Sequence, residues 1–396
     1  MALSDAGAST GREQASTASR ELRVAAVGIS TDRTCGVRDH AVLLAEGLAA
    51  QGVSCSLHWL WREAQTFAPA RAEVSAWTRQ LAGDVGEAAP DAVLLHYSVF
   101  PYSYRGVPVF VARTLAALRD LRVPIVPLLH EYAYPWGKGG VRGATWAATQ
   151  RAALIGVMRA SAAAVVTAPF RVDWLDSRVW LPRRPLAVAP VFSNLPPPSI
   201  ARDAAAQDDV IGLFGYAYEG AAIAPVIDAL RRLREAGAPA RLALLGAPGR
   251  SSAAGEAWVR AARAGGVEGL LSFSGRLSAQ ELSDALAACT VLLSADPSGP
   301  TSRKTTLAAS LASGAPVVAI DGRRTWRELR EAGAATVVPD DGGALAAAVL
   351  ELLEDRRAGD ALGARGREFA RSAMSVERSA RTIAELLRDA LAAHRP

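Results

Sequence analysis

The sequence predicts an α/β protein made of two Rossmann-like domains that face each other across a cleft. Two separate series of alternating strand and helix patterns support this fold class, and a proline-rich stretch divides them. The length of 396 residues also fits two domains of average size better than one core. Parallel sheets bind ligands beyond the carboxyl ends of their strands, so we expect the functional residues in the loops that follow the strands.

The first series begins with the apolar run LRVAAVGIS over 22–30, which predicts a buried strand. A helical pattern follows over 36–52, where Val37, Leu43, Leu44 and Leu48 share one face. The alternation then continues through predicted strands at 53–59, 91–96, 125–129 and 163–167, and predicted helices at 109–121 and 145–160.

The second series begins at Val210 with the apolar run VIGLFG. Between the two series, residues 182–209 are rich in proline, which favours a stiff, extended connection. The predicted strands of the second series lie at 210–215, 241–246, 271–274, 291–294, 316–320 and 335–338, and the predicted helices at 224–236, 253–264, 279–288, 344–354 and 360–394. We therefore divide the chain into a disordered tail (1–20), a first domain (21–190), a linker (191–209), a second domain (210–375) and a C-terminal helix (376–396).

The composition restricts the class of protein further. Half of the residues are hydrophobic and the net charge is +5, which suits an anionic small ligand or loose contact with an acidic membrane surface. The arginines are scattered rather than gathered in a basic stripe, so nucleic acid is not expected as a partner. Three distant cysteines without a CxxC pair argue against a disulfide framework or a structural zinc site, and favour the cytoplasm. The first twenty residues lack the apolar core of a signal peptide.

The most informative segment is DPSGPTSRKTTLAASLASGAPVVAI, residues 296–320. We expect Thr301 or Ser302 to cap a helix that ends at Gly314, before a buried strand. Arg303 and Lys304 then lie at the helix start, where the macrodipole disfavours cations by roughly 0.3–1 kcal/mol each. An anion of phosphate size, held also by Ser302, Thr305 and Thr306, explains this placement. The alternative is a solvated helix start with stray basic residues.

Candidate residues in the first domain follow its predicted strands. His130 and Glu131 follow the strand at 125–129, and an aromatic, glycine-rich loop with rings suited to sugar faces comes next, namely Tyr132, Tyr134 and Trp136. His96 and Tyr97 follow the preceding strand. Gly36 lets a ligand approach the backbone, unless it marks a plain turn, and Arg38 and Asp39 lie beside it. For each histidine, a structural role in packing is the alternative.

Several enzyme classes lack their motifs in this chain. The sequence has no HExxH, GxxxxGK[ST] or GxSxG pattern, so zinc proteases, P-loop nucleotidases and α/β-hydrolases are disfavoured. The segment LFGYAYEG is not GxGxxG, which leaves little support for a nicotinamide dehydrogenase.

From about Leu22 to Leu387, the order of motifs resembles the bacterial GT-B glycosyltransferases, in particular the retaining family-four (group 1) type that uses nucleotide sugars. The resemblance rests on CGVRDHAVLLAEGLAAQG, LLHEY and VVTAPFRVDWL in the first half, and on LFGYAYEG, LSFSGRLSAQELSDALAACTVLLSAD and SGPTSRKTTLAASLASGAPVVA in the second. It implies an acceptor domain at 21–190, a nucleotide-sugar-binding domain at 210–375, and metal-independent transfer without a cofactor, with the nucleotide diphosphate sugar as co-substrate.

The resemblance also assigns roles to the candidate residues. It makes His130 and Glu131 the catalytic pair and gives donor binding to Gly36, Arg276, Ser302, Arg303, Lys304, Thr305 and Thr306. Acceptor binding would fall to Arg38, Asp39, His96, Tyr97, Tyr132, Tyr134 and Trp136. For Arg276 the alternative is a surface role. The acceptor would be a small molecule or lipid-linked, with peripheral contact to a membrane.

Two departures from the family pattern affect these assignments. The paired glutamates that contact sugar and ribose in the family are replaced by Thr301 and Ala309, and the arginine and lysine that clasp the diphosphate by Tyr216 and Glu219. The SRK segment would then take over the diphosphate. Two rival functions stay open: a catalytically degenerate GT-B subunit that binds a partner enzyme, and a nucleotide-sugar epimerase.

Overall fold

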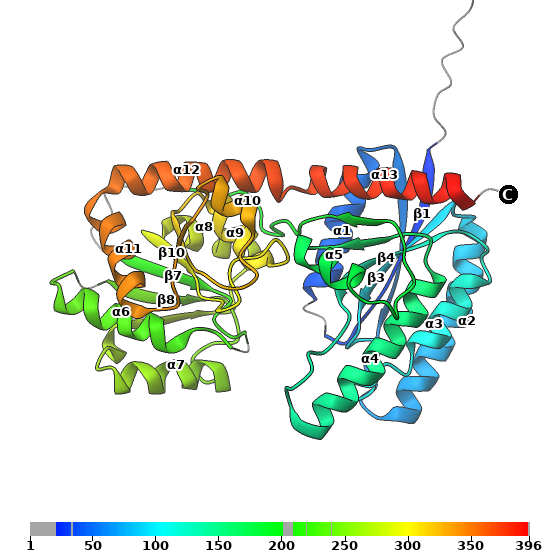
Figure 1. Cartoon of the computed structure of the whole chain (residues 1–396), viewed down its shortest axis with the longest axis horizontal. Coiled ribbons are helices and arrows are strands. Elements are labelled where there is room, and N and C mark those ends of the chain that lie inside the picture. The colour runs from blue at the N-terminus through cyan, green and yellow to red at the C-terminus, as the bar shows by residue number, and fades with distance from the viewer. Residues whose placement is uncertain (1–20, 33–34, 201–208, 219, 239, 395–396) are drawn as a thin grey trace, which may run out of the picture.

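The computed structural model describes residues 21–32, 35–200, 209–218, 220–238 and 240–394. It contains two lobes that lie side by side, each built around a parallel sheet of six strands (Figure 1). The predicted α/β fold class is confirmed. The disordered tail predicted for 1–20 lies outside the described residues.

The first sheet has the strand order β2-β1-β3-β4-β5-β6. Its strands are β1 (Leu22–Ser30), β2 (Val53–Trp61), β3 (Ala92–Ser98), β4 (Ile125–Glu131), β5 (Ala164–Val166) and β6 (Leu186–Val188), and its helices are α1 (Gly36–Ala49), α2 (Phe67–Ala88), α3 (Val111–Arg119), α4 (Gly140–Ala160) and α5 (Pro169–Asp176). Successive residues of β1 point into different clusters, since Val24 packs with Leu44 of α1 and Ala25 with Leu115 of α3. Both faces of this sheet are therefore covered, as its continuous apolar strands predict.

The second sheet has the order β12-β11-β10-β7-β8-β9. Its strands are β7 (Val210–Phe214), β8 (Arg241–Leu245), β9 (Leu271–Gly275), β10 (Val291–Ser294), β11 (Val317–Ile320) and β12 (Thr336–Val338), and its helices are α6 (Ile223–Glu235), α7 (Ala253–Ala264), α8 (Ala279–Ala288), α9 (Thr305–Ser313), α10 (Arg327–Glu331) and α11 (Gly342–Glu354). The strand order reverses between β7 and β10. A crevice at such a switch point is where open α/β sheets bind ligands.

Two long helices join the lobes along one side. Helix α12 (Arg356–Ala373) packs on the second lobe, where Phe369 contacts the core around α9, and α13 (Val376–His394) crosses to the first lobe and packs on α1 (Figure 1). Within the predicted helical region over 360–394, the structure separates the two helices at residues 374–375.

The sequence did not predict α2, α5, α10 or β6, and two predicted helices begin at other residues in the structure. Helix α2 was not predicted, although Ala70, Val74, Trp77, Leu81 and Val85 are buried at helical spacing and carried its signal. Helix α4 begins at 140 rather than 145, because two left-handed glycines lead directly into it. Helix α9 begins at 305, several residues later than its expected cap.

Candidate functional site

The start of α9 lies at the switch point of the second sheet. A small pocket there is bordered by the ends of β7 and β10 and by Gly215, Tyr218, Asp296, Lys304 and Thr306. Lys304 is the residue before the helix, and no side chain caps the helix end. The first backbone N–H groups of an α-helix have no acceptor within the helix, so those of Thr305 and Thr306 are available to a ligand. The anion receptor expected at these residues stays a prediction.

Lys304 is held at the rim of this pocket. Its Nζ lies 3.0 Å from Oδ2 of Asp296 and 4.2 Å from the centre of the Tyr218 ring. Burial raises the pKa of Asp296. The charge of Lys304 and the hydrogen bonds from Ser298 lower it by more, so the net shift of this pKa is downward. The Asp296 carboxylate therefore stays ionised beside Lys304 at the helix start.

Arg303 reaches from the second lobe to the first. Its Nη1 donates a hydrogen bond of 2.7 Å to Oε1 of Glu131, the last residue of β4. The same oxygen also accepts from Nη2 of Arg171 at 3.3 Å. The Nε of Arg303 is buried and has no hydrogen-bond partner among the described residues. One carboxylate thus faces two guanidinium groups, and a donor of Arg303 remains to be satisfied, which favours an incoming anion.

Ser302 and Thr301 lie between the lobes rather than at the helix cap. The Ser302 hydroxyl donates to the carbonyl oxygen of Thr167 at 2.8 Å, and its own carbonyl accepts from Val191 N–H at 2.9 Å. The expected helix cap at Thr301 or Ser302 is therefore wrong, because the Ser302 hydroxyl is used to join the lobes. The same hydrogen bond to Thr167 argues against the donor-binding role expected for Ser302. Thr301 is also buried, and its hydroxyl has no partner among the described residues.

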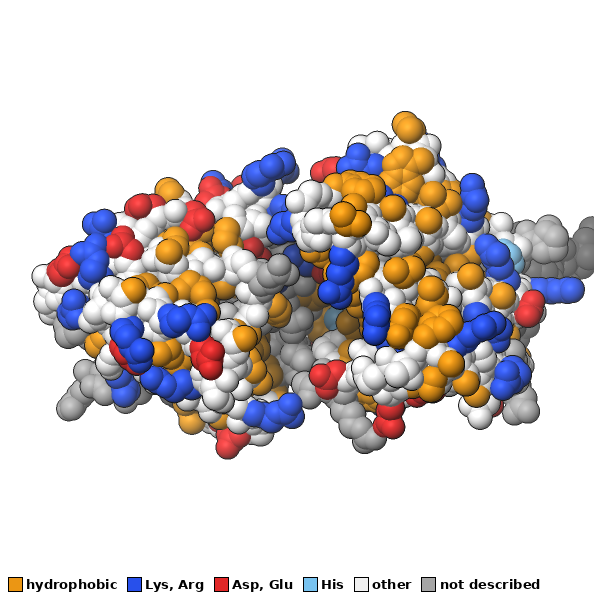
Figure 2. Space-filling model, turned by 90° about the horizontal axis from the view of Figure 1, so that it is seen from below, with side chains coloured by type: hydrophobic (Ala, Val, Ile, Leu, Met, Phe, Trp, Pro, Cys, Tyr) orange, Lys and Arg blue, Asp and Glu red, His pale blue; other side chains and the backbone are white. Residues whose placement is uncertain are grey.

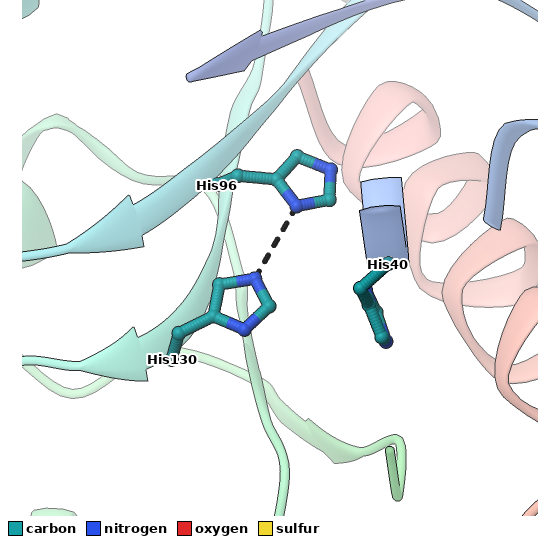
Figure 3. A group of neighbouring side chains, drawn as sticks. All are labelled: His40, His96 and His130. Atoms are coloured by element: carbon teal, nitrogen blue, oxygen red, sulfur yellow. Dashed lines mark hydrogen bonds between the residues drawn. The ribbon is translucent and has the colours of Figure 1, made fainter. Parts of the chain in front are cut away.

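Three histidines meet at the carboxyl edge of the first sheet. His40 comes from the first turns of α1, His96 from β3 and His130 from β4 (Figure 3). The Nδ1 of His96 lies 3.3 Å from Nε2 of His130, and the rings of His40 and His130 meet edge to face at 5.3 Å. The structure thus brings together two residues that the sequence singled out, His96 and His130, and one that it did not.

Burial keeps these imidazoles neutral. It lowers the pKa of His40 to about 4 and of His96 to about 3, and it lowers that of His130 well below its usual range, with His40, His96 and Arg171 adding to the effect. The three rings offer nitrogen atoms within 4.8 Å of one another, a spacing that a metal ion can use. The positive charge of Arg171 beside His130 disfavours a cation there, so we read the cluster as a set of neutral hydrogen-bonding groups. Metal independence stays a prediction.

The first residue of α1 has open space beside it. Gly36 is the first residue of α1, and a Cβ added to it would meet nothing within 4 Å. Arg38 lies over the Trp61 ring at 5.3 Å, and its Nε is buried without a partner in the described structure. Burial raises the pKa of Asp39, and Arg38 partly offsets that effect. The structure leaves Gly36 room for a ligand but shows no crowding that requires glycine.

The aromatic candidates separate into two groups. Tyr97 is fully buried in the core, and its hydroxyl has no partner among the described residues. Tyr132 is also buried, with its ring tilted against that of Trp174 and lying beneath the Arg171 guanidinium. Both positions argue against direct acceptor contact. Tyr134 is half-buried, and Trp136 is exposed near the start of α4.

The remaining predicted positions are on the second lobe. Arg276 follows β9 and is exposed. Its exposure fits both a contact with the nucleotide base and a plain surface role. Ala309 and Tyr216 are buried, and Ala309 borders a cavity of about 540 Å³ between α8, α9 and the linker. Tyr216 accepts a hydrogen bond from Gly249 N–H at 2.7 Å. Neither side chain can replace the family's ribose or phosphate ligands, and Glu219 lies outside the described residues.

Sequence reasoning missed three residues of this site. Arg171, His40 and Tyr218 were not selected, although each has a position that can be recognised. Arg171 lies in the first turn of α5 after β5, His40 lies four residues after Gly36, and Tyr218 follows β7 at the switch point. Arg171 donates to the Leu129 carbonyl at 2.7 Å and is buried, so it fixes the end of β4 where Glu131 and His130 lie.

Comparison with known proteins identifies the second lobe. Residues 208–355 match the family described as "Glycosyl transferases group 1". No curated protein matches the chain. Among solved structures, the chain is similar to sucrose-phosphate synthase from Thermosynechococcus elongatus, with a TM-score of 0.66 and 17% identity over 94% of this chain and 100% of the other.

Two further structures show the same architecture. A glycosyltransferase from Rickettsia africae ESF-5 has a TM-score of 0.67 and 11% identity, covering 94% of this chain and 99% of its own. HepE from Anabaena in complex with UDP has a TM-score of 0.63 and 14% identity, covering 93% of this chain and 100% of its own. These identities support the fold, and the family match supports the activity class. The chain thus has the GT-B fold, and its residues 208–355 match the group 1 glycosyltransferase family.

Proposed function

We propose that this enzyme transfers a sugar from a nucleotide diphosphate sugar to an acceptor hydroxyl, with the diphosphate held at the start of α9. The observation that carries the proposal is the position of Arg303. Its guanidinium reaches Glu131 in the opposite lobe, while its Nε lacks a partner among the described residues and the uncapped helix begins two residues later. The complex of Anabaena HepE with UDP supports a nucleotide as the first ligand to test.

Departure of the nucleoside diphosphate is the demanding step. The bond from the sugar C1 to the diphosphate oxygen breaks, the C1 bond to the acceptor oxygen forms, and the acceptor proton passes to a diphosphate oxygen. The growing negative charge would be stabilised by Arg303, Lys304 and the N–H groups of Thr305 and Thr306. If the proton moves on the same face of the sugar, no protein nucleophile is needed and the product retains configuration, as the resemblance implies.

His130 and Glu131 would act from the first lobe. A neutral imidazole can donate one hydrogen bond and accept another, which suits the positioning of sugar hydroxyls. His96 Nδ1, 3.3 Å from His130 Nε2, would fix the orientation of that ring. Glu131 holds Arg303 before the donor binds, and the diphosphate would then replace the carboxylate on that guanidinium.

Metal independence and a cytoplasmic location belong to this proposal as well. Lys304, Arg303 and the helix start would supply positive charge where other transferases use a divalent ion. With Arg171, these cations outnumber the carboxylates Glu131 and Asp296 that pair with them. No helix in the described ranges has the length and apolar character needed to cross a membrane. The nucleotide sugar is the co-substrate, and we assign no cofactor.

The two rival functions make different use of the same lobes. Thr301 and Ala309 stand where the family has its paired glutamates, and both side chains are buried. The loss of these glutamates favours a degenerate subunit. An epimerase needs carboxylates at the sugar, yet the two carboxylates described around this site, Glu131 and Asp296, are each paired with a cation. We therefore favour transfer over epimerisation.

A nucleotide screen followed by product analysis tests the proposal. Wild-type protein and Arg303→Ala are heated with UDP, GDP, ADP, CDP and dTDP, and the melting temperature is followed. We expect at least one diphosphate to stabilise the wild type and to stabilise the variant less. The sugars of that nucleotide are then offered with and without acceptor hydroxyls. No stabilising nucleotide would favour the degenerate subunit, and an epimerised donor without transfer would favour the epimerase.

A further inference from the structure

One segment of the first lobe, from the end of β4 into α5, carries no acidic residue. Residues 132–172 include no aspartate or glutamate, and their cations are Lys138, Arg142, Arg151, Arg159 and Arg171. The stretch ends at Asp173, which lies on α5 together with Asp176. Figure 2 shows the lower side of this lobe, where hydrophobic side chains gather among lysines and arginines. Such a surface is complementary to an anionic partner.

Tryptophans and arginines alternate on this face and contact one another. Arg142 lies 4.5 Å from the Trp146 ring centre, and Arg151 lies 4.8 Å from that of Trp136 and 5.8 Å from that of Trp174. Trp174 meets Trp180 at 6.2 Å. We call these six residues the tryptophan belt. It runs from the start of α4 to the end of α5.

The arginines of the belt have no carboxylate partner among the described residues. Arg142 and Arg151 form no ion pair there, and the hydrogen bonds of Arg151 go to the carbonyls of Tyr134 and Ala147, both at 2.8 Å. Burial lowers the pKa of Arg151, and the nearby Arg178 lowers it further. Arg151 and Arg178 both lie over the Trp174 ring, so their guanidinium groups are close together, and an approaching anion would relieve their repulsion.

Aliphatic side chains extend from the belt into solvent. Val141 is 86% exposed beside Arg142, and Val179 is 96% exposed beside Arg178. Trp136 is 57% exposed and Trp180 is 38% exposed. Isolated valines of this kind gain nothing from a phosphate backbone of nucleic acid, but they can enter hydrocarbon. Tryptophan rings favour the boundary between lipid headgroups and acyl chains, and arginines there reach the lipid phosphates.

We propose that the tryptophan belt docks on the surface of an anionic lipid bilayer. Val141 and Val179 would insert at the two ends, the tryptophans would lie at headgroup level, and Lys138, Arg142 and Arg151 would bind lipid phosphates. The belt also leads toward the site, because the ring of Trp174 contacts that of Tyr132 at 5.3 Å and Tyr132 lies beneath Arg171, the partner of Glu131. A docked enzyme would thus have the cleft close to the membrane. This inference does not depend on transfer activity.

Vesicle sedimentation tests the proposal directly. The full chain is mixed with vesicles of phosphatidylcholine alone or with one third phosphatidylglycerol, at low and at high salt. The charge variant is Lys138→Glu with Arg142→Glu, and the apolar variant is Val141→Asp with Val179→Asp. A matched control, Arg260→Glu with Arg357→Glu, makes the same charge change on exposed arginines of the other lobe. A cooperative thermal unfolding transition near that of the wild type verifies that each variant is folded.

We expect the wild type to sediment with the anionic vesicles and to be released by salt. The charge variant should lower the partition coefficient at least about tenfold, while the control pair changes it less than threefold. The apolar variant should also bind more weakly and should do so at both salt concentrations. Wild-type protein that stays in the supernatant overturns the proposal. Equal losses in the charge variant and the control, or binding to single-stranded RNA as strong as to vesicles, overturn it as well.

Discussion

Replacing Arg303 with alanine removes the contact on which the proposed donor site most depends. In the free protein the change breaks the pair with Glu131, whose side chain is half exposed. In the complex it removes the charge-assisted hydrogen bonds that the guanidinium, including its unpartnered Nε, would make to the diphosphate. The variant should therefore bind nucleoside diphosphates more weakly than the wild type does.

The magnitude follows from these two contributions. Hydrogen bonds to a charged group contribute about 1.5–3 kcal/mol, whereas a partly exposed ion pair such as Arg303–Glu131 contributes about 1 kcal/mol or less. The donor must displace Glu131 in the wild type but not in the variant, so the net loss is about 1–2 kcal/mol, or roughly 5- to 30-fold in Kd. A nucleoside monophosphate, which offers fewer oxygens at this position, should lose less.

Isothermal titration calorimetry with the diphosphate found in the screen measures the effect. Arg260→Ala is the matched control, since it removes an exposed arginine from α7, away from the site. Glu131→Gln is the reciprocal variant and should bind up to about fivefold more tightly, because Arg303 no longer has to leave a carboxylate. If Arg303→Ala binds the diphosphate as tightly as the wild type and the control, the assignment of the guanidinium to the donor is refuted.

Three further outcomes follow from the structure. Ser302→Ala removes the hydrogen bond to Thr167, so it should destabilise the protein by about 1 kcal/mol, seen as a lower melting temperature, and leave nucleotide Kd within about twofold; weaker nucleotide binding would return Ser302 to the donor site. Tyr97→Phe removes a buried hydroxyl without a described partner, so stability and activity should not fall, and a loss of activity would show that the phenol contacts the acceptor. Burial lowers the pKa of His40 to about 4 and that of His96 to about 3, against about 6.5 in the unfolded chain. Below about pH 6.5 the unfolded chain therefore binds more protons than the folded protein. The free energy of unfolding should then fall by up to about 1.4 kcal/mol per pH unit for each histidine. Urea unfolding between about pH 8 and pH 5 measures this slope, and a flat profile would contradict the neutral cluster.

The regular elements could largely be predicted from sequence, because buried parallel strands leave continuous apolar runs. Strand β1 (Leu22–Ser30), helix α7 (Ala253–Ala264) and helix α8 (Ala279–Ala288) begin and end at the predicted residues. Helix α9 was placed too early, since local capping rules favoured the hydroxyl of Ser302. That hydroxyl instead bonds to Thr167, a contact between residues 135 positions apart that local sequence patterns do not reveal.

The site was predicted in outline but not in its contacts. The anion receptor at Arg303 and Lys304 could be proposed from sequence because the helix dipole disfavours cations at a helix start unless an anion binds there. The pair of Arg303 with Glu131 could not, because it joins different lobes. Tyr97 looked like a site residue because it follows His96, yet strand alternation turns its side chain into the core. His40 was missed for the opposite reason, since it lies within the helix that follows the loop.

A crystal structure with the nucleoside diphosphate bound tests the central claim most directly. The account predicts phosphate oxygens about 2.7–3.2 Å from the Thr305 and Thr306 N–H groups and from the Arg303 guanidinium, with Glu131 released from that arginine. A diphosphate bound elsewhere, with the Arg303–Glu131 pair intact, would contradict it.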